Sequence, residues 1–176
     1  MNRLLVYIVA CAALVVADDE QTRTCVAEEQ SLAIERAVIA KHAEVIGYAE
    51  QLDAEKLYGV IAEGGKGTVI QDGRVLTRQE ALDSSELAYE GFKSQKIEIL
   101  QQYVRVLSPE IAVLTAQGRY AITTDTGETV SSDFAVTSVF VLQENEWKIV
   151  YGHHSTPNIS IAESDGSNIT GAKEKD

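Results

Sequence analysis

The second half of the chain consists mainly of four long segments of β-forming residues, separated only by short polar turns. Each segment is rich in β-branched and aromatic residues, and three of them exceed the length of an average strand. Because successive strands joined by short turns lie antiparallel, the pattern predicts a meander. Long strands in one sheet must also twist and curl. The four predicted strands are residues 96–107, 111–123, 130–143 and 147–156.

Two helical segments begin the first half of the chain. From Glu28 to about Gln51, apolar residues recur at helical spacing, with Glu and Lys on the opposite face. Asp53 fits the N-cap of a second, short helix, which ends at the glycine pair 64–65.

A hairpin and a third helix complete the first half. The Asp-Gly turn at residues 72–73 is predicted to join two short β-forming segments. Thr77 and Glu80 then have the spacing of a capping box, which predicts a helix that runs to about Gly91. Helices followed by a long meander indicate an α+β fold. We expect a cone-shaped, curved antiparallel sheet packed against three helices, which fill its concave face and leave an open mouth.

The composition limits what this fold could bind. The 176 residues fit one domain, and 15 basic against 27 acidic residues give a formal net charge of −12. Nucleic acids and anionic membranes require clustered Lys and Arg side chains, and the sequence contains no basic run. The composition therefore disfavours nucleic acid as a partner.

The N-terminus has the organisation of a secretion signal. A short positive region precedes an apolar run over residues 4–16, and Ala17 offers a cleavage site. The run is too short for a stable membrane span. We therefore expect a signal peptide over residues 1–17 and an exported mature protein, periplasmic or secreted. In the alternative, residues 8–11 resemble a lipobox and Cys11 carries a lipid anchor.

Both flanks of the predicted domain are polar. Residues 18–27 are expected to be loose, the domain to occupy residues 28–157, and residues 158–176 to form a flexible tail. Asn158 and Asn168 begin N-glycosylation triplets, whose use depends on the source organism.

The last predicted strand carries the aromatic and titratable residues that most favour a pocket. Alternation gives it one face that is more apolar and aromatic than the other: Trp147, Ile149, Tyr151 and His153. We expect this face to line the concave interior, whereas a β-bulge would exchange the two faces. His153 is then a candidate catalytic histidine, because an imidazole titrates near neutral pH. The alternative is a core histidine bonded to a neighbouring hydroxyl.

Further candidates come from the helices and the earlier strands. His42 lies within the apolar stripe of the first helix, where a polar group is costly unless it is paired. It is either a second catalytic candidate or a hydrogen-bonded core residue. The candidate ligand-binding side chains are aromatic and include possible hydroxyl donors: Tyr58, Tyr103, Tyr120, Trp147 and Tyr151.

Carboxylates and metal motifs add little to this set. Asp133 and Glu98 are the strand acids that could serve as a general base, and both are expected to face outward. The sequence contains no HExxH, paired CxxC, GxSxG, P-loop or GxGxxG pattern. His153 and His154 are adjacent, so they point to opposite faces of a strand. We therefore expect no metal site and no cofactor.

The closing segment Trp147–Ser155 resembles the last strand of the SnoaL-like branch of the nuclear transport factor 2-like superfamily. The segments Asp133–Val141 and Leu52–Leu57 are similar to the same branch. This resemblance implies a cystatin-like α+β barrel. The closing strand also resembles that of the association domain of calcium/calmodulin-dependent kinases, a non-enzymatic oligomeric hub. Because the superfamily includes isomerases, cyclases, dehydratases and binding domains, the resemblance names no single function.

Two functions remain open from the sequence. In the first, an exported SnoaL-like domain binds a small, mostly apolar molecule and catalyses no reaction. In the second, the domain is a cofactor-independent isomerase, cyclase or dehydratase that uses His153 with a tyrosine or with His42. Strands that are apolar on both faces also predict a homodimer through the outer face of the sheet.

Overall fold

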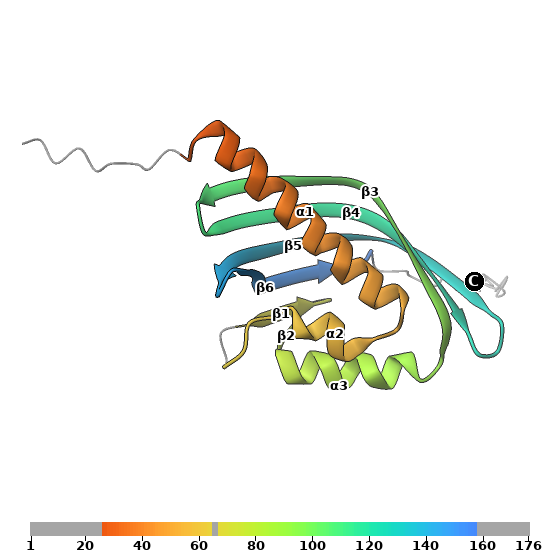
Figure 1. Ribbon diagram of the computed structural model, residues 1–176. Coiled ribbons are helices and arrows are strands. Elements are labelled where there is room, and N and C mark those ends of the chain that lie inside the picture. Colours follow the sequence, from red (N-terminus) through yellow and green to blue (C-terminus); the bar gives the residue numbers. More distant parts are fainter. Residues whose placement is uncertain (1–25, 65–66, 158–176) are drawn as a thin grey trace, which may run out of the picture.

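A computed structural model describes residues 26–64 and 67–157 and has the predicted order of helices and strands (Figure 1). The elements are α1 (Glu28–Glu50), α2 (Ala54–Gly59), β1 (Thr68–Gln71), β2 (Arg74–Thr77), α3 (Arg78–Tyr89), β3 (Phe92–Ser108), β4 (Ile111–Thr124), β5 (Thr129–Gln143) and β6 (Glu146–Ser155). The predicted signal peptide, Cys11, most of the predicted loose segment, and the predicted tail with its two glycosylation triplets lie outside the described residues.

Local sequence signals position the three helices. Asp53 caps α2 by accepting a hydrogen bond from the backbone N–H of Lys56. Helix α3 begins in the predicted capping box, in which Thr77 and Glu80 exchange side-chain-to-backbone hydrogen bonds. The buried residues of α1 recur along one face of the helix: Ile34, Val38, His42 and Ala49.

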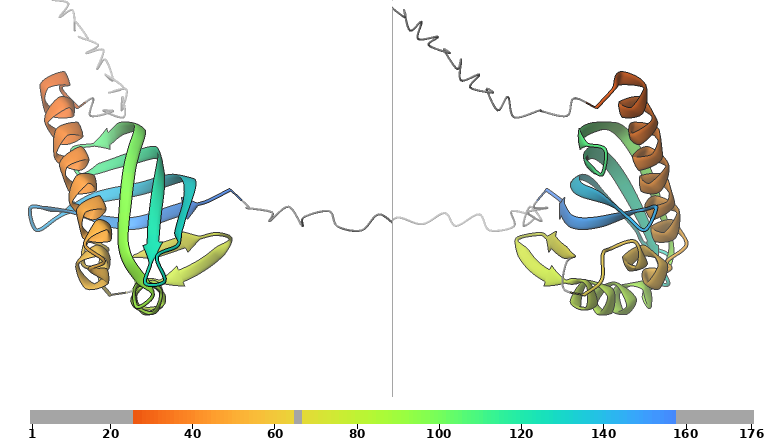
Figure 2. Two further views of the ribbon diagram at one scale, coloured as in Figure 1. Left: turned by 90° about the vertical axis from the view of Figure 1, so that its right-hand side faces the viewer. Right: turned by 60° about the vertical axis from the view of Figure 1, so that its left-hand side comes forward.

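The six strands form one open sheet in the order β2-β1-β6-β5-β4-β3. Strands β3 to β6 are the predicted antiparallel meander. The hairpin β1–β2 extends this meander because β1 pairs parallel to β6. The sheet is therefore mixed, which corrects the purely antiparallel sheet that the sequence predicted. Register shifts along β3 and β6 accompany the strong curl of the sheet (Figure 2).

Helix α1 lies across the concave face of this sheet, and α2 and α3 pack at the end that carries the β1–β2 hairpin (Figures 1 and 2). The core fills the space between α1 and the strands, where Val38, Leu114 and Phe140 are completely buried. No described helix covers the convex face, which leaves Tyr103 67% and Leu107 56% exposed. The fold is thus an α+β cone, as predicted, with an unclosed sheet.

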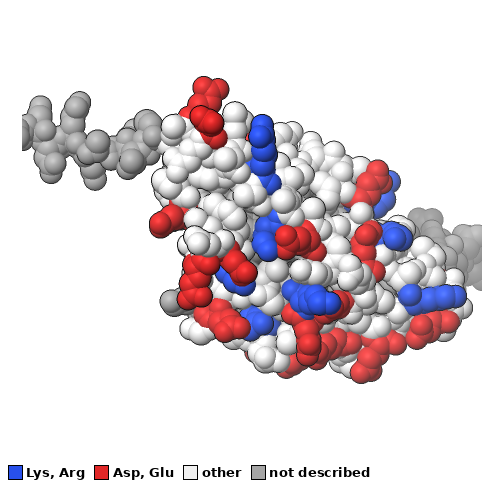
Figure 3. Space-filling model, in the orientation of Figure 1, with Lys and Arg blue, Asp and Glu red and all other residues white. Residues whose placement is uncertain are grey.

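Charged side chains lie on the outside of this cone. On the face that Figure 3 shows, acidic side chains gather along the edge formed by α3. The exposed acids of that helix and its C-cap are Glu80, Asp83, Glu86 and Glu90. Among the helices of residues 26–64 and 67–157, none combines the length and the apolar character that a membrane crossing requires.

Candidate functional site

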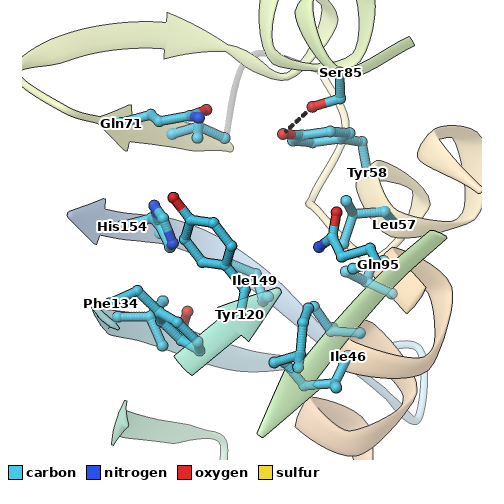
Figure 4. Close-up of a pocket in the computed structure, with 18 of the residues that line it drawn as sticks. Ile46, Leu57, Tyr58, Gln71, Ser85, Gln95, Tyr120, Phe134, Ile149 and His154 are labelled. Atoms are coloured by element: carbon cyan, nitrogen blue, oxygen red, sulfur yellow. Dashed lines mark hydrogen bonds between the residues drawn. The ribbon is translucent and has the colours of Figure 1, made fainter. Parts of the chain in front are cut away.

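A cavity of about 380 Å³ lies between the concave face of the sheet and the three helices (Figure 4). Every helix and every strand except β2 contributes to its wall. Most wall residues are apolar: Val45, Ile46, Ala49, Leu57, Val60, Ile61, Val69, Ala88, Phe92, Ile97, Ile122, Phe134, Val136 and Ile149.

Polar wall residues lie on opposite sides of this cavity. Gln71 and His154 come from the paired strands β1 and β6, and they face Tyr58 and Ser85 from α2 and α3 (Figure 4). Ser138 is also buried within the wall. The interior therefore offers scattered neutral hydrogen-bonding groups within an apolar surface.

Three aromatic rings from neighbouring strands form a row on the sheet side of the cavity. The ring centroids of Tyr120 and Phe134 lie 6.4 Å apart, with 29° between the ring planes. Those of Phe134 and His154 lie 5.4 Å apart, with 26° between the planes. Gly118 makes room for this row, because a Cβ there would lie 2.6 Å from Cζ of Phe134 and 2.5 Å from the carbonyl oxygen of Glu98.

A β-bulge at Val150 decides which histidine faces the interior. The register between β5 and β6 shifts by one residue here, so Val150 is the extra residue of β6. Before the bulge, Ile149 is buried as predicted. After the bulge, His154 lies on the inner face of the sheet, where it pairs with the wall residue Val136. His153 contributes atoms to the wall but is exposed. The predicted inner face was therefore wrong beyond Val150.

Burial sets the charge of His154. Desolvation lowers the pKa of its imidazole, and the nearby Asp72 carboxylate offsets only part of this effect. The ring is therefore neutral at pH 7 and presents one N–H donor and one acceptor nitrogen. Oδ1 of Asp72 accepts hydrogen bonds from the backbone N–H of Thr156 at 3.0 Å and from its hydroxyl at 3.1 Å. These bonds tie the β1–β2 turn to the end of β6.

Tyr58 and Ser85 form a polar pair on the helical side, with their hydroxyl oxygens 2.9 Å apart (dashed line in Figure 4). Burial raises the pKa of Tyr58, and it raises the pKa of Tyr89, another wall residue, to about 12. Both phenols therefore stay protonated at neutral pH. Nε of Arg78 donates to the backbone carbonyl of Tyr58 at 2.7 Å, which joins α2 to the start of α3.

His42 combines the two roles that the sequence left as alternatives. It is 4% exposed within the stripe of α1, and it lines the cavity. Its Nδ1 lies 3.1 Å from Oε1 of Gln102 on β3. Burial lowers the pKa of the imidazole, and the bond to Gln102 opposes this only in part. A neutral imidazole beside an amide oxygen donates through Nδ1–H.

The other predicted aromatic residues divide between the wall and the outside. Tyr58 and Tyr120 line the cavity. Tyr103 and Tyr151 are instead 67% and 37% exposed, because strand alternation and the bulge turn them to the convex face. Trp147 packs half-buried against the core and is not a wall residue. The predicted placement of these last three in the cavity is thus corrected.

The strand acids lie where the sequence predicted, on the outside of the sheet. Oδ1 of Asp133 lies 2.7 Å from Nε of Arg119, and Glu98 is exposed. Within the described part of the chain, no cluster of three or more His, Cys, Asp or Glu residues could hold a metal ion.

The wall also includes polar and aromatic residues that were not predicted from the sequence, among them Tyr89, Gln95 and His154. Gln95 lies two residues before the wall residue Ile97, so strict alternation along β3 would have placed both on one face. The inward turn of His154 depends on the bulge, which has no local signal in the sequence.

Solved structures with the same fold share little sequence with this chain. A candidate scytalone dehydratase from Novosphingobium aromaticivorans gives a TM-score of 0.67 at 12% identity, over 73% of this chain and 87% of its own. A Caulobacter vibrioides protein with a cystatin-like fold gives 0.58 at 18% identity, over 74% and 94%. The C. elegans CaMKII association domain gives 0.60 at 14% identity, over 73% and 99%. At these identities the likeness establishes the fold alone.

Comparison with sequences gives a more specific result. No curated protein sequence matches the chain. A family model for the SnoaL-like domain matches residues 38–159, which include most of α1, the cavity wall and all six strands. Because this match spans more than half of the chain, the protein belongs to the SnoaL-like domain family.

Proposed function

We propose that the protein binds a small, mostly apolar, uncharged organic molecule in the cavity between the sheet and the helices. The composition of the cavity wall carries this proposal. The cavity volume of about 380 Å³ falls within the usual range of small-molecule pockets, roughly 300–1,000 Å³. Among the described wall residues none is Lys or Arg, and Asp72 is the only carboxylate. An apolar ligand body with a few neutral polar atoms matches such a wall.

The polar wall groups would orient this ligand. His154 is neutral, and the Tyr58–Ser85 pair keeps its protons at neutral pH. Buried polar groups require hydrogen-bond partners, so a ligand that displaces water from them must replace those bonds. The ligand is therefore expected to carry one or two oxygen or nitrogen atoms that face these groups. Its apolar body would supply affinity at about 25 cal/mol per Å² of buried surface.

Extraction of the purified protein with organic solvent, followed by mass spectrometry, tests the proposal. Val136→Phe should remove the ligand, because Val136 lines the cavity and the larger side chain would fill it. Val139→Phe is the matched control, since Val139 lies on the same strand but is not a wall residue. An extract without a ligand, together with no binding of apolar probes by the wild-type protein, would contradict the proposal.

One observation favours a second candidate function, a cofactor-independent isomerase, cyclase or dehydratase. Burial lowers the pKa of His154, so at neutral pH its imidazole is in the unprotonated form that a general base requires. Tyr120 lies in the same row of rings, separated from His154 by Phe134. Its hydroxyl could donate a hydrogen bond to a substrate oxygen.

The extracted ligand would distinguish the two functions. If the extracted ligand is a substrate, incubation with fresh protein should change its mass or isomer composition. His154→Gln should slow that change, whereas Tyr151→Phe, on the exposed face of the same strand, should not. A ligand that is returned unchanged by the wild-type protein would favour binding over catalysis.

Export is also part of the proposed function, on the basis of the apolar run over residues 4–16 and the cleavage site at Ala17. The intact mass of the protein made in cells tests it. A mature chain that starts at Asp18 supports secretion, a lipid on Cys11 supports the anchored alternative, and retention of the first 17 residues contradicts both.

A homodimer through the convex face of the sheet is the expected assembly. That face carries exposed apolar and aromatic side chains: Tyr103, Leu107, Ile111 and Tyr151. The likeness to an association domain is consistent with an oligomer. In sedimentation experiments Tyr103→Glu should give monomers, whereas Leu87→Glu, on exposed α3, should not. A monomeric wild-type protein at micromolar concentration would contradict this assembly.

A further inference from the structure

The environment of His42 restricts what kind of ligand atom can approach it. The residue is 4% exposed and lines the cavity. Nδ1 has a partner in Oε1 of Gln102, at 3.1 Å. The amide oxygen cannot donate, so the proton of this hydrogen bond belongs to Nδ1.

The second ring nitrogen, Nε2, has no hydrogen-bond partner among the described residues. Yet no buried side-chain nitrogen or oxygen in the described part of the chain lacks a partner. Among the described residues, the two statements agree when Nε2 of His42 reaches open space. Since His42 is a wall residue of the cavity, that space is the cavity itself.

Gln102, the partner of His42, lies in the same cross-strand row as the other inward-facing histidine, His154. Gln102, Ala116, Val136 and His154 are paired in one row across β3, β4, β5 and β6. Three strand spacings of about 4.8 Å separate the ends of this row by roughly 14 Å along the curved sheet. Of the two residues between the ends, Val136 lines the cavity, and both His42 and His154 line the same cavity.

We infer that Gln102 is a positioning residue, which holds His42 as the Nδ1–H tautomer so that its bare Nε2 accepts a hydrogen bond from a hydroxyl or N–H group of the ligand. This inference rests on the proposed function for the existence of the ligand, and it adds that the ligand carries a donor on its apolar body. A ligand whose polar atoms are all acceptors would leave Nε2 buried without a partner, which lowers affinity.

The tautomer can be measured in the unliganded protein by ¹⁵N NMR of labelled histidine. In the wild-type protein, Nδ1 of His42 should give a pyrrole-type shift and Nε2 a pyridine-type shift. Gln102→Leu should move the ring toward the Nε2–H tautomer, and Gln102→Glu should preserve Nδ1–H because a carboxylate also accepts. Gln101→Leu is the matched control, since Gln101 is exposed and bonds to Gln117. A wild-type Nε2–H tautomer, or no response to Gln102→Leu, would overturn the role of Gln102.

The ligand half of the inference is tested with two probes, 1-naphthol and 1-methoxynaphthalene, which differ in a single O–H donor. The wild-type protein should bind 1-naphthol about fivefold more tightly, as expected for one net hydrogen bond. The preference should shrink in Gln102→Leu and persist in Gln101→Leu. Equal binding of the probes by the wild-type protein would overturn the donor requirement. If neither probe binds, the donor requirement is overturned for such ligands, and an extract without a ligand would then contradict the proposed function as well. The tautomer result still decides the role of Gln102.

Discussion

Replacement of Gly118 by alanine should destabilise the fold, whereas the same change at Gly152 should not. Both glycines lie inside long strands of the same sheet, β4 and β6. A Cβ at Gly118 would meet the carbonyl oxygen of Glu98 at 2.5 Å and the ring of Phe134 at 2.6 Å. At Gly152 the nearest atom, Cγ2 of Ile149, would lie at 3.8 Å, an ordinary contact.

The size of the effect follows from what can move at Gly118. The Glu98 carbonyl belongs to the backbone of the neighbouring strand, and Phe134 is buried between other rings, so neither yields freely. Overpacking of this kind costs about 1–3 kcal/mol. Both alanine variants also gain about 0.4–1 kcal/mol because the unfolded chain loses conformational freedom. The free energies of unfolding of the two variants should therefore differ by about 1–3 kcal/mol.

Urea unfolding monitored by fluorescence of Trp147, the single tryptophan, and by circular dichroism measures this difference. The m-value should stay constant, so that a lower midpoint reports stability alone. Equal free energies of unfolding for Gly118→Ala and Gly152→Ala would refute the steric argument. An equal loss in Gly152→Ala would show that strand glycines matter for a reason other than the space taken by Phe134.

Three further predictions concern the polar groups. Thr77→Ala removes the capping box of α3 and should cost about 1 kcal/mol in urea unfolding; an unchanged midpoint would contradict the role of the cap. Tyr58→Phe leaves Ser85 without its partner and should cost about 0.5–1.5 kcal/mol, with no loss expected for Tyr151→Phe on the exposed face. Burial lowers the pKa of His42 and of His154 below the ordinary 6.5. Below about pH 6.5 the unfolded chain therefore binds more protons than the folded protein, and the free energy of unfolding falls as the pH drops. A double His42→Asn, His154→Asn variant should weaken this pH dependence, and an unaltered dependence would refute the assignment.

Features set by local chemistry could be predicted from the sequence. The apolar period of α1, the Asp53 cap and the capping box at Thr77 each depend on residues within a turn or two of one another. The four long strands and their short turns likewise require only neighbouring residues. The fold class and the resemblance to the SnoaL-like family followed from this order of elements.

Features set by long-range pairing could not be predicted. The parallel contact between β1 and β6 joins segments about half the chain apart, and nothing in either segment specifies it. The bulge at Val150 arises where β6 must match the curvature of β5, so the face of His154 depends on two strands at once. The partner of His42 is Gln102, which alternation alone places as one more half-buried strand residue.

The place of β6 in the sheet also determines when this domain becomes complete during synthesis. The strand made last inserts between the hairpin made early and β5, and Ile149 exchanges backbone hydrogen bonds with Val60 and Ala62. Until it emerges from the ribosome, the nascent chain has two unjoined sheet fragments with exposed apolar edges. The proposed ligand binding therefore requires β6, and a stop codon shortly before residue 146 should abolish it rather than weaken it.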